Sequence, residues 1–102
     1  MSIRELAATM EARLPCTEKL ILAILAEGCG DDDDCHVNMD RVFAYSGMGR
    51  EQFDATMEAI IAKGYLTERG PSPMFEWQTA FWFNTAKLDE IAIRWARGSD
   101  GK

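Results

Sequence analysis

Apolar residues recur at helical spacing through the first quarter of the chain. Positions 3, 6, 7, 10 and 14 are apolar, which predicts an amphipathic helix over residues 2–13 that Pro15 ends. The next segment, EKLILAILAEG, is apolar nearly all round from position 20 to position 26. This segment predicts a helix in the middle of the core, capped by Thr17 and ended near Gly28.

The middle of the chain predicts two short helices joined by a tight turn. GCGDDDDC reads as a loop and HVN as a short extended segment. Asn38 is a good cap for the helix MDRVFAYSG, which Gly47 closes. A second helix over about 50–63 is closed by Gly64. Two short helices joined by YSGMG form a helix-turn-helix unit.

The last third of the chain predicts a two-stranded hairpin and a closing helix. YLTE is the first strand, RGPSP the turn and FEWQTAFWFN the second strand, in which alternation must leave at least one of Phe81, Trp82 and Phe83 exposed. Asn84 or Thr85 caps a helix that carries apolar residues at 88, 91 and 95.

These elements predict a mainly α chain with a small β-hairpin, an α+β winged helix-turn-helix. We expect one winged-helix domain over residues 1–97, which includes the N-terminal helix 2–13, and a flexible tail over 98–102. The predicted core consists of Leu20, Ile21, Ile24, Phe43, Phe53, Met57, Ile60 and Leu66.

The segment from Leu14 to Leu66 resembles the winged helix-turn-helix of phage and plasmid replication and regulatory proteins. The matching features are Leu14, Pro15 and Thr17, the loop 31–34, and the glycines at 47 and 64. AFWFN followed by a helix is similar to the second wing strand of that family. The resemblance implies a fold that commonly binds duplex DNA, although one fold hosts many functions.

The predicted recognition helix departs from that family in its charge. The family caps this helix with Ser or Thr and presents basic and polar residues, whereas here the cap is Gly49 and the exposed positions are Glu51, Gln52, Asp54, Ala55, Glu58 and Ala59. The predicted buried face is Phe53, Met57, Ile60 and Ile61, and Arg50 falls nearer to it.

Charge therefore disfavours a phosphate-binding surface on this helix. The chain has 17 acidic and 11 basic residues, a net charge of −6. Each carboxylate close to a phosphate is repelled by about 1 kcal/mol even in water. Arg41 and Arg69 are the only nearby cations expected to help. The helix suits a protein partner, such as a complex with a basic groove, better than it suits DNA.

The segment CGDDDDCH admits three interpretations. Cys29, Cys35, His36 and an aspartate could bind zinc, although their spacing matches no common zinc module. Cys29 and Cys35 could form a disulfide. The third interpretation, which we favour, is a solvated acidic loop over Asp31, Asp32, Asp33 and Asp34. We expect no metal and no cofactor.

Nothing in the sequence predicts an enzyme or a membrane protein. A cysteine nucleophile would have to use the single His36, and no third group is marked to orient it. The longest apolar run is too short to span a bilayer, and the N-terminus has no signal-peptide pattern. An odd number of cysteines suits a reducing compartment, so we expect a cytoplasmic protein, in the bacterial host cytosol if a phage encodes it.

Three functional hypotheses follow. The first is a non-enzymatic phage or mobile-element protein that inhibits a protein partner or mimics DNA, as an anti-CRISPR-like protein would. Its predicted partner-binding residues are Glu51, Gln52, Asp54, Ala55, Glu58, Arg69, Met74 and Phe75. The second is a sequence-specific duplex-DNA-binding regulator of transcription or replication. The third is a structural subunit of a larger assembly. A homodimer, if it forms, is expected to pair through the apolar stripes of the first and last helices.

Overall fold

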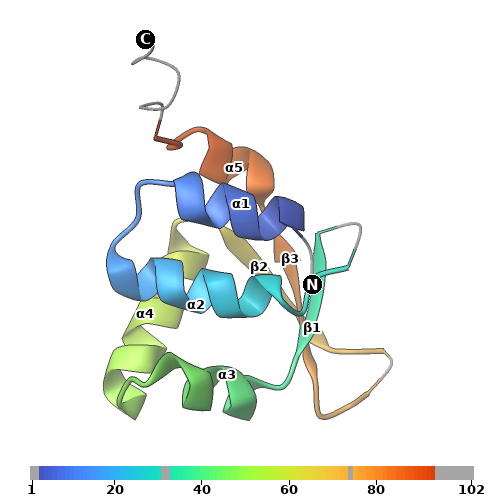
Figure 1. Ribbon diagram of the computed structural model, residues 1–102. Coiled ribbons are helices and arrows are strands. Elements are labelled where there is room, and N and C mark those ends of the chain that lie inside the picture. Colours follow the sequence, from blue (N-terminus) through green and yellow to red (C-terminus); the bar gives the residue numbers. More distant parts are fainter. Residues whose placement is uncertain (1–2, 31–32, 74, 94–102) are drawn as a thin grey trace, which may run out of the picture.

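Five helices and three strands make up the part of the chain that the structure describes, residues 3–30, 33–73 and 75–93 of a computed structural model (Figure 1). The predicted tail over 98–102 lies outside these residues. In chain order the elements are α1 (Ile3–Glu11), α2 (Cys16–Ala26), β1 (Asp34–Val37), α3 (Met39–Ser46), α4 (Arg50–Ala62), β2 (Leu66–Pro71), β3 (Thr79–Phe83) and α5 (Thr85–Asp89). The chain is an α+β protein, as predicted.

The strands form one antiparallel sheet in the order β1-β3-β2. β2 and β3 are the predicted hairpin, and the extended HVN segment becomes part of β1, which pairs with the other edge of β3. Alternation along β3 buries Phe81 and Phe83 and leaves Trp82 partly exposed, as predicted. The predicted second strand was too long, because residues 75–78 form the turn and β2 continues through Pro71.

The helix boundaries follow the capping chemistry at most ends. The side chain of Asn38 accepts a hydrogen bond from the amide of Asp40 (3.0 Å), and Gly47 ends α3 with a φ of 71°. That left-handed conformation favours glycine. Asn84, rather than Thr85, caps α5 by accepting from the amide of Lys87 (3.1 Å). The predicted Thr17 cap was wrong, because α2 begins at Cys16 and follows Pro15, whose φ of −55° already suits a helix.

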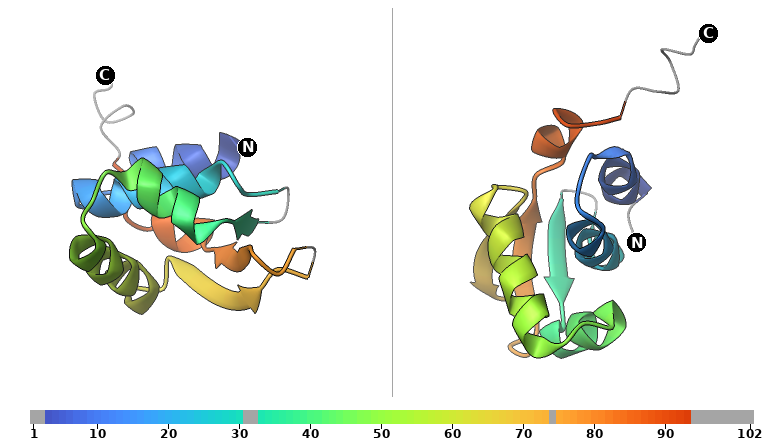
Figure 2. Two further views of the ribbon diagram at one scale, coloured as in Figure 1. Left: turned by 90° about the horizontal axis from the view of Figure 1, so that it is seen from below. Right: turned by 90° about the vertical axis from the view of Figure 1, so that its left-hand side faces the viewer.

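The helices stack in layers beside the sheet. In Figure 1, α5 lies above α1, α1 lies above α2, and α3 lies below them. Figure 2 shows α1 and α2 side by side from two further directions, with α4 away from α1. α2 packs against α1, α3, α4 and β1, so it is the central helix, as predicted.

The core is built from all the elements that surround α2. Its fully buried members include Ile21, Leu22, Leu25, Ile60, Leu66, Phe81, Phe83 and Leu88. Of the predicted core, Ile24 and Phe43 are only partly buried, and Leu20 is 41% exposed. The prediction for Leu20 was wrong because α2 packs through the side that carries positions 21, 22, 25 and 26.

The two ends of the described chain pack against each other. The amide of Arg13 donates to the carbonyl of Ile91 (2.8 Å), next to a bridge between Ala12 and Ala92. The last helix was predicted to carry Ile91, but it ends at Asp89 and the chain then runs alongside the end of α1. Leu88 is fully buried and Ile91 is partly buried, and Trp95, the third position of the predicted stripe, lies outside the described residues.

Candidate binding site

The exposed side of α4 carries the acidic residues that the helical spacing predicted. Glu51, Gln52, Asp54, Ala55 and Glu58 are all exposed to solvent. Gly49 occupies the N-cap position and provides no side-chain cap. The helix therefore presents three carboxylates in a row to whatever approaches it.

The buried side of α4 differs from the prediction at two positions, 56 and 61. The buried residues are Phe53, Thr56, Met57 and Ile60, with spacings of three, one and three. Ile61 was predicted to be buried, but it is 36% exposed. Thr56 takes the buried place because its hydroxyl donates to the carbonyl of Gln52 (2.7 Å), which satisfies the polar group within the helix.

Arg50, which was predicted to fall nearer to the buried face, lies at the start of this surface. Its guanidinium carbon lies 4.1 Å from the centre of the Phe43 ring and 5.8 Å from that of Phe53, a cation–π arrangement. The same guanidinium lies 3.5 Å from a carboxylate oxygen of Asp54. The α4 face thus holds one cation that is stacked on aromatic rings and paired with one of its acids.

A groove of about 300 Å³ runs between α4 and the sheet. Its apolar surface comes from both sides, with Met57 and Ile61 on α4, Phe81 on β3 and Met39 on α3. Its charged lining residues are Arg50, Asp54, Glu58 and Glu68. The groove was not predicted, because it forms only where β2 and β3 approach α4.

Glu68 is the site residue that sequence reasoning missed. It lies on β2, is exposed, and lines the groove together with Glu58 of α4. Alternation along β2, which begins with the buried Leu66, does not show which helix packs beside the strand. The proximity of this acid to α4 could therefore not be predicted from the sequence.

The predicted hairpin contacts belong to a different part of the surface. Phe75 is exposed and stacks on Trp77 with ring centres 5.2 Å apart, and Arg69 is exposed on β2. Neither Arg69 nor Phe75 lines the groove. Met74 lies outside the described residues. The structure therefore does not bring the predicted hairpin residues together with the acids of α4.

A larger cavity of about 630 Å³ lies between α2, β1, α3 and the hairpin. Its lining mixes aromatic, polar and charged side chains, among them Arg41, Tyr45, His36 and Trp77. The Nε of Arg41 donates to the hydroxyl of Tyr45 (3.3 Å), and the guanidinium lies over the Tyr45 ring. Arg41 therefore lines this cavity and not the groove. The expectation that it adds a cation to the α4 surface finds no support in the residues that line the groove.

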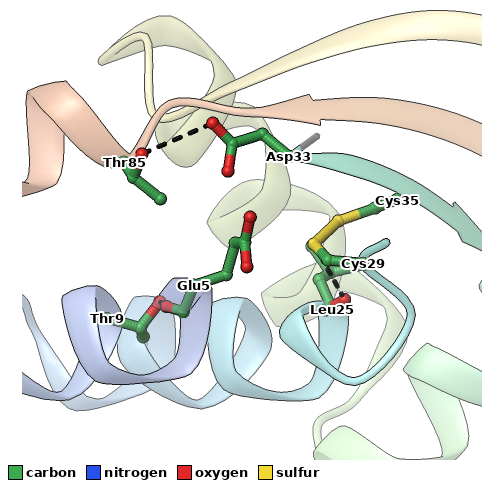
Figure 3. The surroundings of a disulfide bond; sticks show 7 residues. All are labelled: Glu5, Thr9, Leu25, Cys29, Asp33, Cys35 and Thr85. Atoms are coloured by element: carbon green, nitrogen blue, oxygen red, sulfur yellow. Dashed lines mark hydrogen bonds between the residues drawn. A yellow bond between two sulfur atoms is a disulfide. The ribbon is translucent and has the colours of Figure 1, made fainter. Parts of the chain in front are cut away.

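The segment 29–35 departs from the solvated acidic loop that we favoured. Cys29 and Cys35 form a disulfide that joins the end of α2 to β1 (Figure 3). Asp34 is exposed, as expected, but Asp33 is buried, and Asp31 and Asp32 lie outside the described residues. The backbone carbonyl of Asp33 accepts from the amide of Phe83 (2.8 Å), which draws this residue into the sheet edge.

Asp33 is buried together with Glu5 of α1 (Figure 3). The hydroxyl of Thr85 and the guanidinium of Arg4 each lie 3.4 Å from one carboxylate oxygen of Asp33. Burial raises the pKa of Glu5, and a hydrogen bond with Asp33 raises it further. Neither acid lines the groove or the larger cavity, and Arg4 of α1 contacts both Asp33 and Thr85, so this cluster links α1 to the start of α5.

The described residues contain no group of three or more His, Cys, Asp or Glu side chains placed to hold a metal ion. Within the same residues, no helix is long and apolar enough to cross a bilayer. Comparison with family models, curated proteins and solved structures gave no match for this chain.

Proposed function

We propose that this protein is a non-enzymatic winged helix-turn-helix protein whose acidic α4 face binds the basic surface of a protein partner. The observation that carries the proposal is the row of exposed carboxylates at Glu51, Asp54 and Glu58 on the helix that would otherwise read DNA. Inhibition of a nucleic-acid-binding protein, by occupying or mimicking its DNA site, is the mode of action that this charge favours.

The arrangement of the elements supports the winged-helix assignment. α3 and α4 are joined by a turn at Gly47–Gly49, and α4 is followed by the β2–β3 hairpin. β1 precedes α3 and pairs with β3, so the helix pair is framed by one sheet. The same arrangement favours duplex DNA as the alternative ligand, because a helix-turn-helix places its second helix in the major groove.

The charge of α4 decides our preference between these ligands. Affinity for DNA comes mainly from contacts between cations and phosphates. Each such contact adds close to one unit to the slope of log K against log salt concentration. Arg50, the cation at the start of the face, is already stacked on Phe43 and paired with Asp54. We expect binding to random duplex DNA at physiological salt to be weak, with a Kd on the order of 10⁻⁴ M or higher.

Fluorescence anisotropy with labelled random and genomic duplexes tests this proposal. The α4 variant, which carries Glu51→Gln, Asp54→Asn and Glu58→Gln, should bind duplex DNA more tightly than the wild type. It removes repulsion of the phosphates without adding a cation. A matched variant makes the same change in net charge at three exposed acids away from α4, by Glu11→Gln, Glu27→Gln and Glu90→Gln. It should increase the affinity for duplex DNA less than the α4 variant does. The wild type, and not the α4 variant, should displace duplex DNA from basic DNA-binding domains used as test partners.

Two results would contradict the proposal. Nanomolar wild-type binding to one duplex sequence that the α4 variant abolishes would establish the DNA-binding alternative. Equal displacement of duplex by the wild type and the α4 variant would show that the acidic face of α4 does not bind the basic partner.

A further inference from the structure

The groove between α4 and the sheet combines an apolar floor with acids on two walls. Met57, Ile61 and Phe81 provide the apolar surface, while Glu58 lies on the α4 wall and Glu68 on the β2 wall. At about 300 Å³ it is at the lower end of the range of about 300–1,000 Å³ in which small-molecule sites fall. A groove of this size suits one or two inserted side chains.

We propose that this groove receives an arginine side chain of the partner, from a basic segment with apolar neighbours. The inference rests on the proposed function and specifies the chemistry of the partner. The planar guanidinium can pair with carboxylates in a bidentate manner, while the aliphatic stem lies on apolar surface. Glu58 and Glu68 provide the carboxylates and the exposed part of Ile61 the apolar contact, while Phe81, which is only 2% exposed, lies beneath them in the floor of the groove.

The chain's own Arg50 demonstrates this mode at the edge of the same groove. Its guanidinium lies 4.1 Å from the ring centre of Phe43 and 3.5 Å from a carboxylate oxygen of Asp54. Arg50 therefore neutralises one of the three groove acids. Glu58 and Glu68 have no ion pair with a described basic residue. The groove keeps an excess of negative charge beside its apolar surface, which is complementary to a cation with an apolar stem.

A fluorescein-labelled peptide of alternating arginine and leucine, titrated with the full chain, tests the proposal. The groove variant Glu58→Gln, Glu68→Gln should weaken peptide binding roughly tenfold or more, which corresponds to about 1.4 kcal/mol. The matched variant Glu11→Gln, Glu90→Gln changes the net charge equally at exposed acids that lie away from α4 and do not line the groove, and should weaken binding by about twofold or less. Both variants change exposed side chains, and circular dichroism should show both to be folded.

Changes in the peptide separate the guanidinium from the apolar contacts. Replacing each arginine with citrulline, which keeps the shape and removes the charge, should abolish binding. Replacing each leucine with alanine should weaken it. Lysine in place of arginine should bind more weakly at equal charge, because an ammonium cannot pair with a carboxylate in a bidentate manner.

Three outcomes would overturn the inference. These are equal losses in the groove and matched variants, equal binding of the citrulline peptide, or no saturable binding to the arginine peptide. If the α4 variant still loses displacement of duplex from basic domains while any of these holds, the groove inference fails and the proposed function stands.

Discussion

Lys63, at the end of α4, holds the buried carboxylate of Glu18 on α2. Its ammonium nitrogen lies 2.8 Å from one carboxylate oxygen and 3.0 Å from the other, and the Glu18 side chain is only 8% exposed. The pair links residues 45 positions apart and joins the central helix to the helix of the candidate site. It therefore helps to fix the angle at which the acidic face of α4 is presented.

Removal of Lys63 should destabilise the protein, because it leaves the Glu18 carboxylate buried without its cation. We expect Lys63→Met to reduce the free energy of unfolding by roughly 1.5–3 kcal/mol, measured by urea denaturation at neutral pH. Lys87→Met removes an exposed lysine that has no ion pair with a described residue, and serves as the control. Equal stability of the two variants would show that the Lys63–Glu18 pair contributes nothing.

The Glu5–Asp33 pair should make stability depend on pH in a defined direction. The folded protein raises the pKa of Glu5 above its usual value of 4.5, by burial first and by the hydrogen bond and charge of Asp33 next, while the charge of Arg4 acts in the opposite direction. Above about pH 4.5 the folded state therefore binds more protons at this group than the unfolded state does. Its contribution to stability is fully present below that pH and is lost as the pH rises through the folded pKa.

Glu5→Gln mimics the protonated side chain and should reverse this loss. We expect the variant to gain stability relative to the wild type as the pH rises from 4 to 8. The measurement is the Tm of both proteins, from thermal unfolding at each pH. Glu11→Gln, at an exposed position of the same helix, is the control for a charge change. A constant difference in Tm between Glu5→Gln and the wild type over this range would contradict the assignment.

Thiol chemistry separates the three interpretations of the Cys29–Cys35 segment. With the disulfide in place, one thiol (Cys16) should react with iodoacetamide in the denatured protein, and three should react after reduction, as read by intact mass. Reduction should lower the free energy of unfolding by about 2 kcal/mol, as loop closure of this length predicts. Three reactive thiols without reduction would refute the disulfide, and one equivalent of zinc lost on Cys35→Ser would establish a metal site instead.

Two adjacent isoleucines test the register of α4. Ile60 is fully buried and Ile61 is 36% exposed at the groove. Ile60→Asp places a charge in the core and should cost more than about 4 kcal/mol, enough to remove the cooperative thermal transition. Ile61→Asp should leave that transition in place. A folded Ile60→Asp variant would show that the helix is rotated from the position described.

Local physical chemistry was enough to predict much of this protein from its sequence. Asn38 and Gly47 mark the ends of α3 because a side-chain cap and a left-handed glycine act within a few residues. The exposed acids of α4 follow from helical spacing, which needs no knowledge of the partner elements. Exposure of Trp82 between Phe81 and Phe83 follows from strand alternation in the same way.

Tertiary structure decided what depends on segments that are distant in sequence. Glu68 joins Glu58 in one groove only because β2 packs against α4, and Lys63 finds Glu18 only because α4 packs against α2. Leu20 is exposed, and Asp33 is buried, because neighbouring elements cover one side of a segment and leave the other open. Periodicity predicts that a helix has an apolar face, but the direction that this face points is set by the packing of the whole chain.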